Sequence, residues 1–296
     1  MGYVPVRYGF GDGGEYGLSN AFAPPNSIPT SMMRLGTQGW NYAAWVGPFY
    51  PSGTRPADFL TTYARAFDTV EVDSTFYAIP SERTVLGWAE RTPNEFVFSL
   101  KMPREVTHDR RLRGTDELVS TFLDRVRLLG PKLGVVLVQF GPDFGISNFR
   151  DLSRFLGTLP TDVRFAVEFR QAQWITSELL ELLRDRGVAL ALNDGPWIPR
   201  ETLLELASRP TAGFSYVRWM GPDRNITDFS HVQVDRSREL EAWTVALRTL
   251  RELSRAFGYT NNHFAGHGPA TAREVQRLLG IEPVDPRTLG DQMTLF

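Results

Sequence analysis

Charged, histidine and amide side chains stand at the ends of several short apolar runs in this sequence. The candidate catalytic residues are acids, one lysine and one histidine: Glu71, Asp73, Lys101, His108 and Glu168. The candidate substrate-binding residues are mostly cations, amides and aromatics: Trp40, Tyr42, Tyr77, Gln139, Arg170, Asn193, Asp194, Arg218, Asn261 and Asn262. Lysine and arginine can bind an anionic oxygen such as that of phosphate, and histidine or glutamate can act as general acid or base.

These residues need a scaffold that brings distant parts of the chain together. Across residues 34–280, short apolar or β-branched runs alternate with stretches of helical spacing, such as Phe59, Tyr63 and Phe67. The predicted strands are the eight runs 34–38, 69–73, 95–101, 133–140, 164–170, 188–193, 214–218 and 259–263. This alternation predicts a single α/β domain, a (β/α)8 barrel of the TIM type.

The alternative fold is an open doubly wound sheet. Such a sheet usually carries a glycine-rich phosphate-binding turn after its first strand, and residues 36–40 match that turn poorly. In a closed barrel the carboxyl ends of all the strands meet around one crevice. We therefore expect the candidate residues to share one pocket.

Charge pairing is expected in that crevice, because a buried carboxylate must be paired or neutralised. The expected partners are the acids Glu71, Asp73 and Glu168 and the cations Lys101, Arg170 and Arg218. A purely structural lattice of salt bridges is the alternative to a functional site. We favour function, because so many charges in one crevice are costly to keep without use.

Composition limits the classes of partner. The 296 residues carry a formal net charge of −2, so nucleic-acid binding would need a local basic patch, for which the arginines of the third loop are candidates. No apolar run approaches the ~20 residues that span a bilayer. The N-terminus lacks a secretory signal pattern, so we expect no membrane attachment and a cytoplasmic location.

Metal chemistry is restricted by the side chains present. The chain has no cysteine, which excludes disulfides, thiolate zinc sites and a cysteine nucleophile. Its four histidines are His108, His231, His263 and His267. They are too few at the strand ends for a trinuclear zinc cluster. We expect no cofactor, with a single Mg²⁺ or Mn²⁺ on carboxylate oxygens as the alternative.

Six segments form a recognisable set of motifs. They are 36–40 (GTQGW), 45–51 (WVGPFYP), 71–77 (EVDSTFY), 107–108 (TH), 168–170 (EFR) and 261–262 (NN). The set resembles the YecE-like family, also called domain of unknown function seventy-two. The resemblance covers roughly residues 34–280 and implies a TIM-type barrel without a settled activity. The chain departs from the family pattern at Asp73, usually asparagine, and at Trp219-Met220, usually leucine and histidine.

The two ends of the chain differ from this central domain. Residues 1–33 are rich in glycine and proline and predict a flexible or draped extension. Residues 281–296 predict a linker that ends in Gln292, Leu295 and Phe296. This ending resembles the short peptide with which bacterial replication and repair proteins bind the sliding clamp. The alternative is that the last two apolar residues pack on the barrel itself.

Three functions are consistent with these features. The first is an enzyme, most simply a hydrolase or lyase, that acts on a phosphorylated or nucleic-acid-related substrate and is brought to DNA by its tail. The second is a small-molecule hydrolase, lyase or isomerase for a substrate such as a sugar phosphate. The third is a non-catalytic module that binds nucleic acid.

Removing the last five residues should abolish binding of the purified sliding clamp, because the apolar end supplies the inserted side chains. A pull-down that compares the full chain with the shortened one measures this. Equal recovery of the clamp by both chains would contradict the interpretation of the tail.

Overall fold

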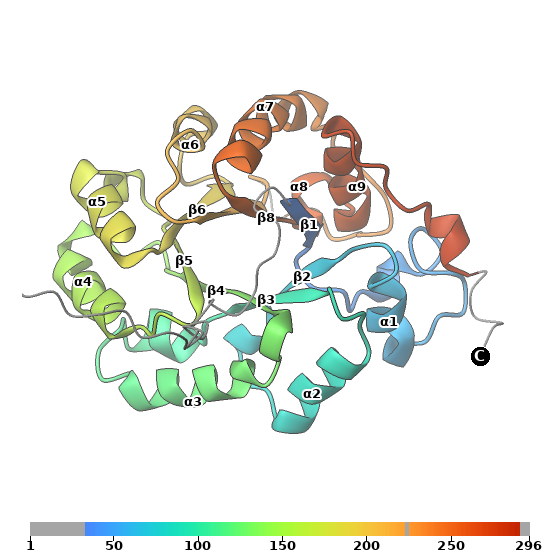
Figure 1. The fold of residues 1–296 in the computed structure, drawn as a ribbon. Coiled ribbons are helices and arrows are strands. Elements are labelled where there is room, and N and C mark those ends of the chain that lie inside the picture. The colour runs from blue at the N-terminus through green and yellow to red at the C-terminus, as the bar shows by residue number, and fades with distance from the viewer. Residues whose placement is uncertain (1–32, 223–224, 291–296) are drawn as a thin grey trace, which may run out of the picture.

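The structure is a computed structural model that describes residues 33–222 and 225–290, and parallel strands form its central barrel (Figure 1). The eight strands are β1 (Met33–Thr37), β2 (Thr69–Val72), β3 (Val97–Lys101), β4 (Leu133–Gln139), β5 (Arg164–Glu168), β6 (Ala189–Asp194), β7 (Phe214–Trp219) and β8 (Arg255–Thr260). β1 pairs with β8, β2 to β8 pair in chain order, and a single bridge between Gln38 and Glu71 joins the segments of β1 and β2. This confirms the predicted barrel and excludes the open doubly wound sheet.

Helices cover the outside of the barrel and connect the strands (Figure 1). They are α1 (Phe59–Tyr63), α2 (Glu82–Glu90), α3 (Asp116–Arg127), α4 (Phe149–Thr158), α5 (Ser177–Arg186), α6 (Arg200–Leu206), α7 (Ser237–Leu253), α8 (Asn262–Ala265) and α9 (Gly268–Leu278). Local signals fix the ends of α5. The Thr176 side chain accepts the N–H of Leu179, and Gly187 ends the helix in the left-handed region.

The seam between β1 and β2 is closed by a tyrosine hydroxyl in place of a full backbone ladder. Tyr63 Oη accepts the N–H of Thr37 at 2.9 Å and donates to the carbonyl of Thr69 at 3.0 Å. Beyond it, the N–H of Gly39 donates directly to the Glu71 carbonyl at 2.8 Å. A Cβ on Gly36 would lie 2.1 Å from the Thr69 carbonyl oxygen, so the approach of the two strands requires glycine there.

The barrel interior changes from apolar to charged toward the carboxyl ends of the strands. Every second residue of a strand faces inward. The deeper inward positions form an apolar cluster that includes Val97, Val135, Leu137, Ala166, Ala189, Ala191, Phe214 and Phe257. A hydroxyl layer follows, in which Tyr259 Oη lies 2.8 Å from both Ser99 Oγ and Thr69 Oγ1. Lys101 and Glu71 come two residues later on the same strands, so they belong to a charged layer above the hydroxyls.

The eighth strand lies earlier in the chain than the sequence pattern predicted. The prediction of 259–263 was wrong, since β8 spans Arg255–Thr260 and directly follows α7. Gly258 interrupts the run of apolar residues that would otherwise indicate this strand in the sequence. In the structure this glycine makes room for its neighbours, since a Cβ there would lie 2.8 Å from side-chain atoms of both Leu35 and Trp219.

The ends of the chain are described in part. Residues 281–290 lie against the barrel, where Leu289 is buried and its carbonyl accepts from Arg65 Nη1 at 2.8 Å. Gln292, Leu295 and Phe296 lie outside the described residues, as does the predicted N-terminal extension apart from Met33. Within the described ranges, no helix has the length and apolar character that crossing a bilayer would require.

Tyr63→Phe should lower the free energy of unfolding by about 1–3 kcal/mol, because it leaves the N–H of Thr37 and the carbonyl of Thr69 without their shared partner. Urea unfolding followed by circular dichroism measures the change. The matched control is Tyr77→Phe, at a side chain that is 80% exposed, with an expected change within about 0.5 kcal/mol. Equal changes in both variants would show that the Tyr63 hydroxyl does not hold the seam.

Candidate functional site

A buried arginine on β7 organises the charged layer. The Arg218 side chain is only 1% exposed. Its Nη2 and Nε lie 2.6 and 2.9 Å from the two carboxylate oxygens of Glu71, and its Nη1 lies 2.6 Å from Glu168 Oε2. The Tyr216 hydroxyl also donates to Glu71 Oε2 at 2.6 Å. One guanidinium therefore pairs with two carboxylates that strands β2 and β5 carry into the barrel.

The two carboxylates differ in their readiness to hold a proton. Burial raises the pKa of Glu71 to about 7, although Arg218 opposes that rise. Burial acts on Glu168 in the same direction, but Arg218 and Arg170 outweigh it and hold the pKa of this carboxyl below its ordinary value. Glu168 is therefore a firm anion at neutral pH, whereas Glu71 titrates close to neutrality.

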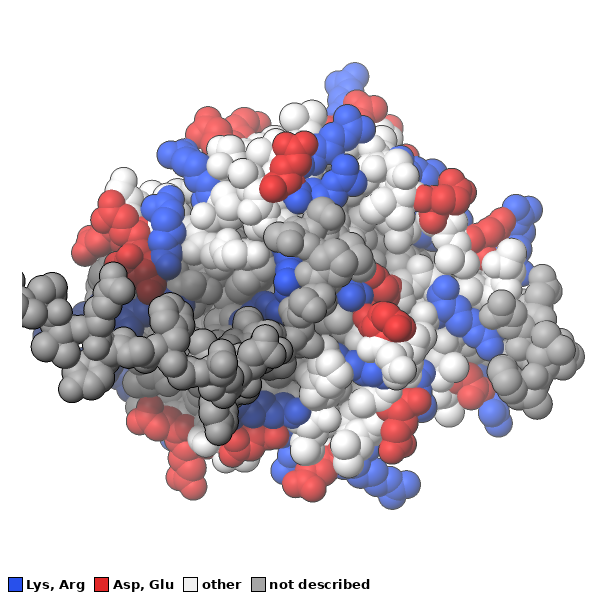
Figure 2. Space-filling view, in the orientation of Figure 1, with Lys and Arg blue, Asp and Glu red and all other residues white. Residues whose placement is uncertain are grey.

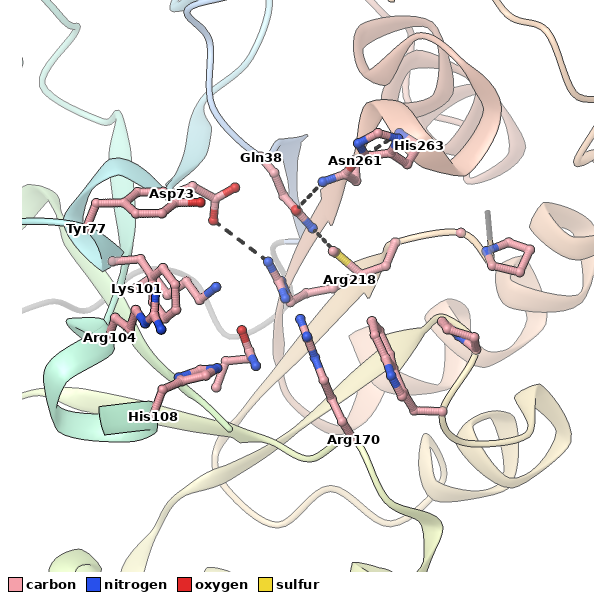
Figure 3. A pocket seen from close by; sticks show the side chains of 17 residues that line it. Gln38, Asp73, Tyr77, Lys101, Arg104, His108, Arg170, Arg218, Asn261 and His263 are labelled. Carbon is pink, nitrogen blue, oxygen red and sulfur yellow. Dashed lines mark hydrogen bonds and ion pairs between the residues drawn. The ribbon is translucent and has the colours of Figure 1, made fainter. Parts of the chain in front are cut away.

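A cavity of about 440 Å³ opens above this charged layer at the carboxyl ends of the strands. Figure 3 shows Asp73, Lys101, Arg170 and Arg218 pointing toward one another across it. Of the predicted site residues, those that line it are Asp73, Tyr77, Lys101, His108, Gln139, Arg170, Arg218 and Asn261. Eight predicted side chains, carried by several strands and loops, thus share one pocket.

Two cations of the cavity wall rest on aromatic rings. Lys101 Nζ lies 3.8 Å from the centre of the Phe76 ring, and the Arg170 guanidinium lies 4.2 Å from that of Trp197. Burial, reinforced by Arg218, lowers the pKa of Lys101 to about 8. At neutral pH this lysine is therefore much closer to losing its proton than a lysine in water.

His108 is an uncharged member of the same wall. Burial and the neighbouring Lys101 lower its pKa to about 4, and Arg170 adds to the effect. Its Nδ1 lies 2.8 Å from Thr107 Oγ1, and its ring meets the Phe76 ring edge-on with centroids 5.0 Å apart. The imidazole therefore presents a neutral group to the cavity at neutral pH.

Other predicted residues have structural partners away from the cavity. The Asp194 carboxylate accepts from Arg200 Nε at 2.9 Å and from Trp243 Nε1 at 2.7 Å. Asn262 Oδ1 accepts from Trp45 Nε1 at 3.1 Å and from the N–H of residue 268 at 2.8 Å. These two side chains join the barrel wall to its outer helices.

The remaining predicted residues lie around or beneath the cavity. Glu71, Glu168 and Asn193 are buried, and neither of the acids is part of the cavity lining. Trp40 packs edge-on against Trp88, and the Tyr42 hydroxyl donates to a backbone carbonyl of the first loop at 3.2 Å. None of these side chains except the Arg218-bound acids contributes to the charge of the site.

Loop residues of the cavity were missed by the sequence reasoning. They include Phe76, Trp197 and Met220, which no strand pattern marks. The aromatic partner of Arg170 comes from the loop after β6, and only the folded loop brings the two together. The Ser-Thr-Phe-Tyr motif is the one signal that could have found Phe76.

Two of the candidate metal-ligating carboxylates bind an arginine. Glu71 and Glu168 both face Arg218, so a guanidinium occupies the position in which their oxygens converge. Among the described residues, no group of three or more histidine, aspartate and glutamate side chains is placed to hold a metal ion.

Comparison with known proteins supplies the family. Residues 34–293 match the family described as protein of unknown function DUF72. The chain belongs to this family. This confirms the resemblance that the Gly-Trp and Ser-Thr-Phe-Tyr motifs indicated.

This DUF72 protein is similar in sequence to two curated relatives and in structure to a solved member of the family. The UPF0759 protein YecE of Escherichia coli K12 is 34% identical over 157 residues, which are 53% of this chain and about half, 55%, of YecE. YunF of Bacillus subtilis is 26% identical over 277 residues, covering 85% of this chain and 96% of YunF. The crystal structure of a DUF72 family protein from Thermotoga maritima superposes with a TM-score of 0.71 at 26% identity, over 84% of this chain and 99% of that one.

Arg218→Met should lower the free energy of unfolding by about 3–5 kcal/mol, because it leaves two buried carboxylates without their cation. Without that cation the folded state takes up protons at higher pH, so the loss should shrink as the pH falls. Urea unfolding at several pH values measures both effects.

The control is Arg113→Met, which breaks a pair with Asp151 from an arginine that is 70% exposed. Its expected cost is at most about 1 kcal/mol. A pH-independent loss of similar size in both variants would contradict the central role of Arg218.

Proposed function

We propose that this DUF72 protein is an enzyme that acts on a small phosphorylated substrate, such as a sugar phosphate. The observation that carries the proposal is the charge of the cavity wall. Its cations are Lys101, Arg104, Arg170 and Arg218, and its acid is Asp73. Even with the two carboxylates behind Arg218 counted, the lining has four cations for three acids, although Arg104 is also paired with Asp109 at 3.2 Å outside the lining. A phosphate group, with its several anionic acceptors, suits such a wall.

The shape of the site favours a small molecule over a nucleic acid. The cavity volume of about 440 Å³ lies in the range of small-molecule sites, roughly 300–1,000 Å³. The arginines of the third loop are already paired with acids, as Arg110 with Glu105, Arg111 with Asp143 and Arg113 with Asp151. On the visible described surface in Figure 2, basic and acidic side chains are interspersed. Of the three functions considered, the small-molecule enzyme therefore has the best support.

The groups of the site support acid–base chemistry near neutral pH. A general acid or base works best when its pKa lies near the working pH. Lys101, with a pKa of about 8, meets this condition and lines the cavity. Glu71, with a pKa of about 7, lies behind Arg218 and reaches the cavity only through that guanidinium. These properties suit a hydrolase, lyase or isomerase.

Inorganic phosphate and ribose 5-phosphate should bind to the full-length protein, and Arg170→Gln should weaken the binding by about 10- to 100-fold, the loss of one charged hydrogen-bond donor. The affinity should also fall as the pH rises through about 8, where Lys101 loses its positive charge. Isothermal titration calorimetry measures both effects.

The matched control is Arg113→Gln, on the third loop outside the cavity, which should leave phosphate binding unchanged. A single-stranded oligonucleotide serves as the competing ligand. Tight oligonucleotide binding that weakens in Arg113→Gln, with no phosphate binding, would overturn the proposal in favour of a nucleic-acid function.

A further inference from the structure

The use of lysine in this chain is highly selective. Of 32 lysine and arginine residues, only Lys101 and Lys132 are lysines. Arginine thus serves nearly every cationic position of the protein. A guanidinium stays protonated in proteins, whereas an ammonium can lose its proton and become a nucleophile. The two lysines therefore mark positions where the choice of cation calls for a specific explanation.

Lys132 has a structural explanation. Its Nζ donates to the carbonyl of Ala89 at 2.5 Å and to the carbonyl of Thr92 at 2.7 Å, and it lies 3.2 Å from Thr92 Oγ1. These acceptors surround the C-terminal end of α2. A compact ammonium with three donors fits this position, and it stabilises the helix end by meeting its free carbonyls.

Lys101 has no such set of acceptors. Among the described residues, its Nζ makes no hydrogen bond and no ion pair within 4.0 Å, and its near neighbour is the Phe76 ring at 3.8 Å. The buried acids of the site are bound to Arg218 instead. In Figure 3 the lysine projects into the cavity between Asp73 and His108. It is thus an amine held ready for a ligand rather than a structural cation.

The surroundings of Lys101 favour its neutral form. An apolar ring lies against the ammonium, and Arg218 places a second positive charge in the same layer. Burial and this second charge disfavour the protonated state and so activate the lysine as a nucleophile, and they outweigh the charges of Asp73, Glu168 and Glu71. The contact with the ring itself favours the ammonium form. With a pKa of about 8, an appreciable fraction of the amine is free at neutral pH.

We propose that Lys101 is the nucleophile of this site and forms an imine with the aldehyde or ketone group of a small anionic substrate. The anionic part of this inference rests on the proposed function, with Arg170 and Arg104 as the cavity-lining cations that would contact the substrate's phosphate or carboxylate. The covalent part rests on Lys101 alone. Substrates of this class are carbonyl compounds that carry one anionic group.

The reaction balances without a further reagent. The Lys101 nitrogen attacks the carbonyl carbon, a C–N bond forms, and one proton moves from nitrogen to oxygen to give a carbinolamine. The second proton of the nitrogen then moves to the hydroxyl oxygen, the C–O bond breaks, the oxygen leaves as water, and the nitrogen electron pair forms the C=N bond. Water reverses these steps and releases the product. Asp73 lines the same cavity and can carry the proton between nitrogen and oxygen.

The imine narrows the reaction class. Once protonated, it withdraws electrons from the neighbouring carbon, which weakens C–H and C–C bonds next to the former carbonyl group. This chemistry serves a lyase or an isomerase, and it gives no advantage to hydrolysis of a phosphate ester. The inference therefore deepens the proposed function by selecting between its reaction classes.

Pyridoxal 5′-phosphate tests the proposal, because it joins an aldehyde to a phosphate. The full-length protein is incubated with this probe, reduced with borohydride and mapped by peptide mass spectrometry. We expect the reduced adduct on Lys101 and none on Lys132, whose ammonium is enclosed by acceptors. The rate of labelling should reach half its maximum near pH 8, well below the value for a lysine in water.

Pyridoxal, which lacks the phosphate, is the matched probe and should label Lys101 at least about 10-fold more slowly, since it lacks the charged hydrogen bonds. Arg170→Gln should remove most of that preference, and inorganic phosphate should compete with the first probe. Lys101→Arg keeps the charge and should still bind inorganic phosphate while forming no adduct.

The outcomes separate the two proposals. Labelling confined to the N-terminus or to Lys132, or an absent shift in the pH profile, would overturn the imine while leaving phosphate binding to be judged by calorimetry. Equal labelling of Lys101 by both probes would support the nucleophile and overturn the anionic substrate. Because wild-type protein gives the adduct map, the test does not depend on the folding of a variant.

Discussion

The ion cluster around Arg218 is the constraint on which the rest of the site depends. Two carboxylates from different strands, Glu71 on β2 and Glu168 on β5, are buried and need a cationic partner, and one guanidinium binds both through its three nitrogens. The cluster fixes the carboxyl ends of β2, β5 and β7 relative to one another. It also forms the charged floor above which the cavity opens.

The same cluster sets the chemistry of its neighbours. Because Arg218 takes both buried acids, Lys101 is left to face the cavity and the Phe76 ring, and the positive charge of Arg218 helps to lower its pKa. Lys101 in turn lowers the pKa of His108. The sequence presented a structural salt-bridge lattice as the alternative to a functional site, and in the structure that lattice forms the floor beneath the cavity.

Many residues of the candidate site could be predicted from the sequence, because side chains alternate between the two faces of a strand. Lys101, Arg170 and Arg218 were found because strand alternation is local and places every second residue in the barrel. Asp194 was expected in the cavity but binds Arg200 and Trp243 instead. Its side chain leaves the end of β6 toward α6 and α7, where these two partners lie. Trp197 and Met220 were missed because loop conformation depends on contacts that no short segment contains.

The sequence by itself determined the eight-unit alternation, the barrel and the inward face of each strand, since these follow from periodicities that a few residues carry. The sequence also shows directly that only two of the 32 basic residues are lysines. Only the tertiary structure decided that Tyr63 would close the seam, that β8 would begin at Arg255, and that one arginine would hold both buried acids. Those choices depend on which distant groups meet at hydrogen-bond distance, and a linear pattern contains no such distances.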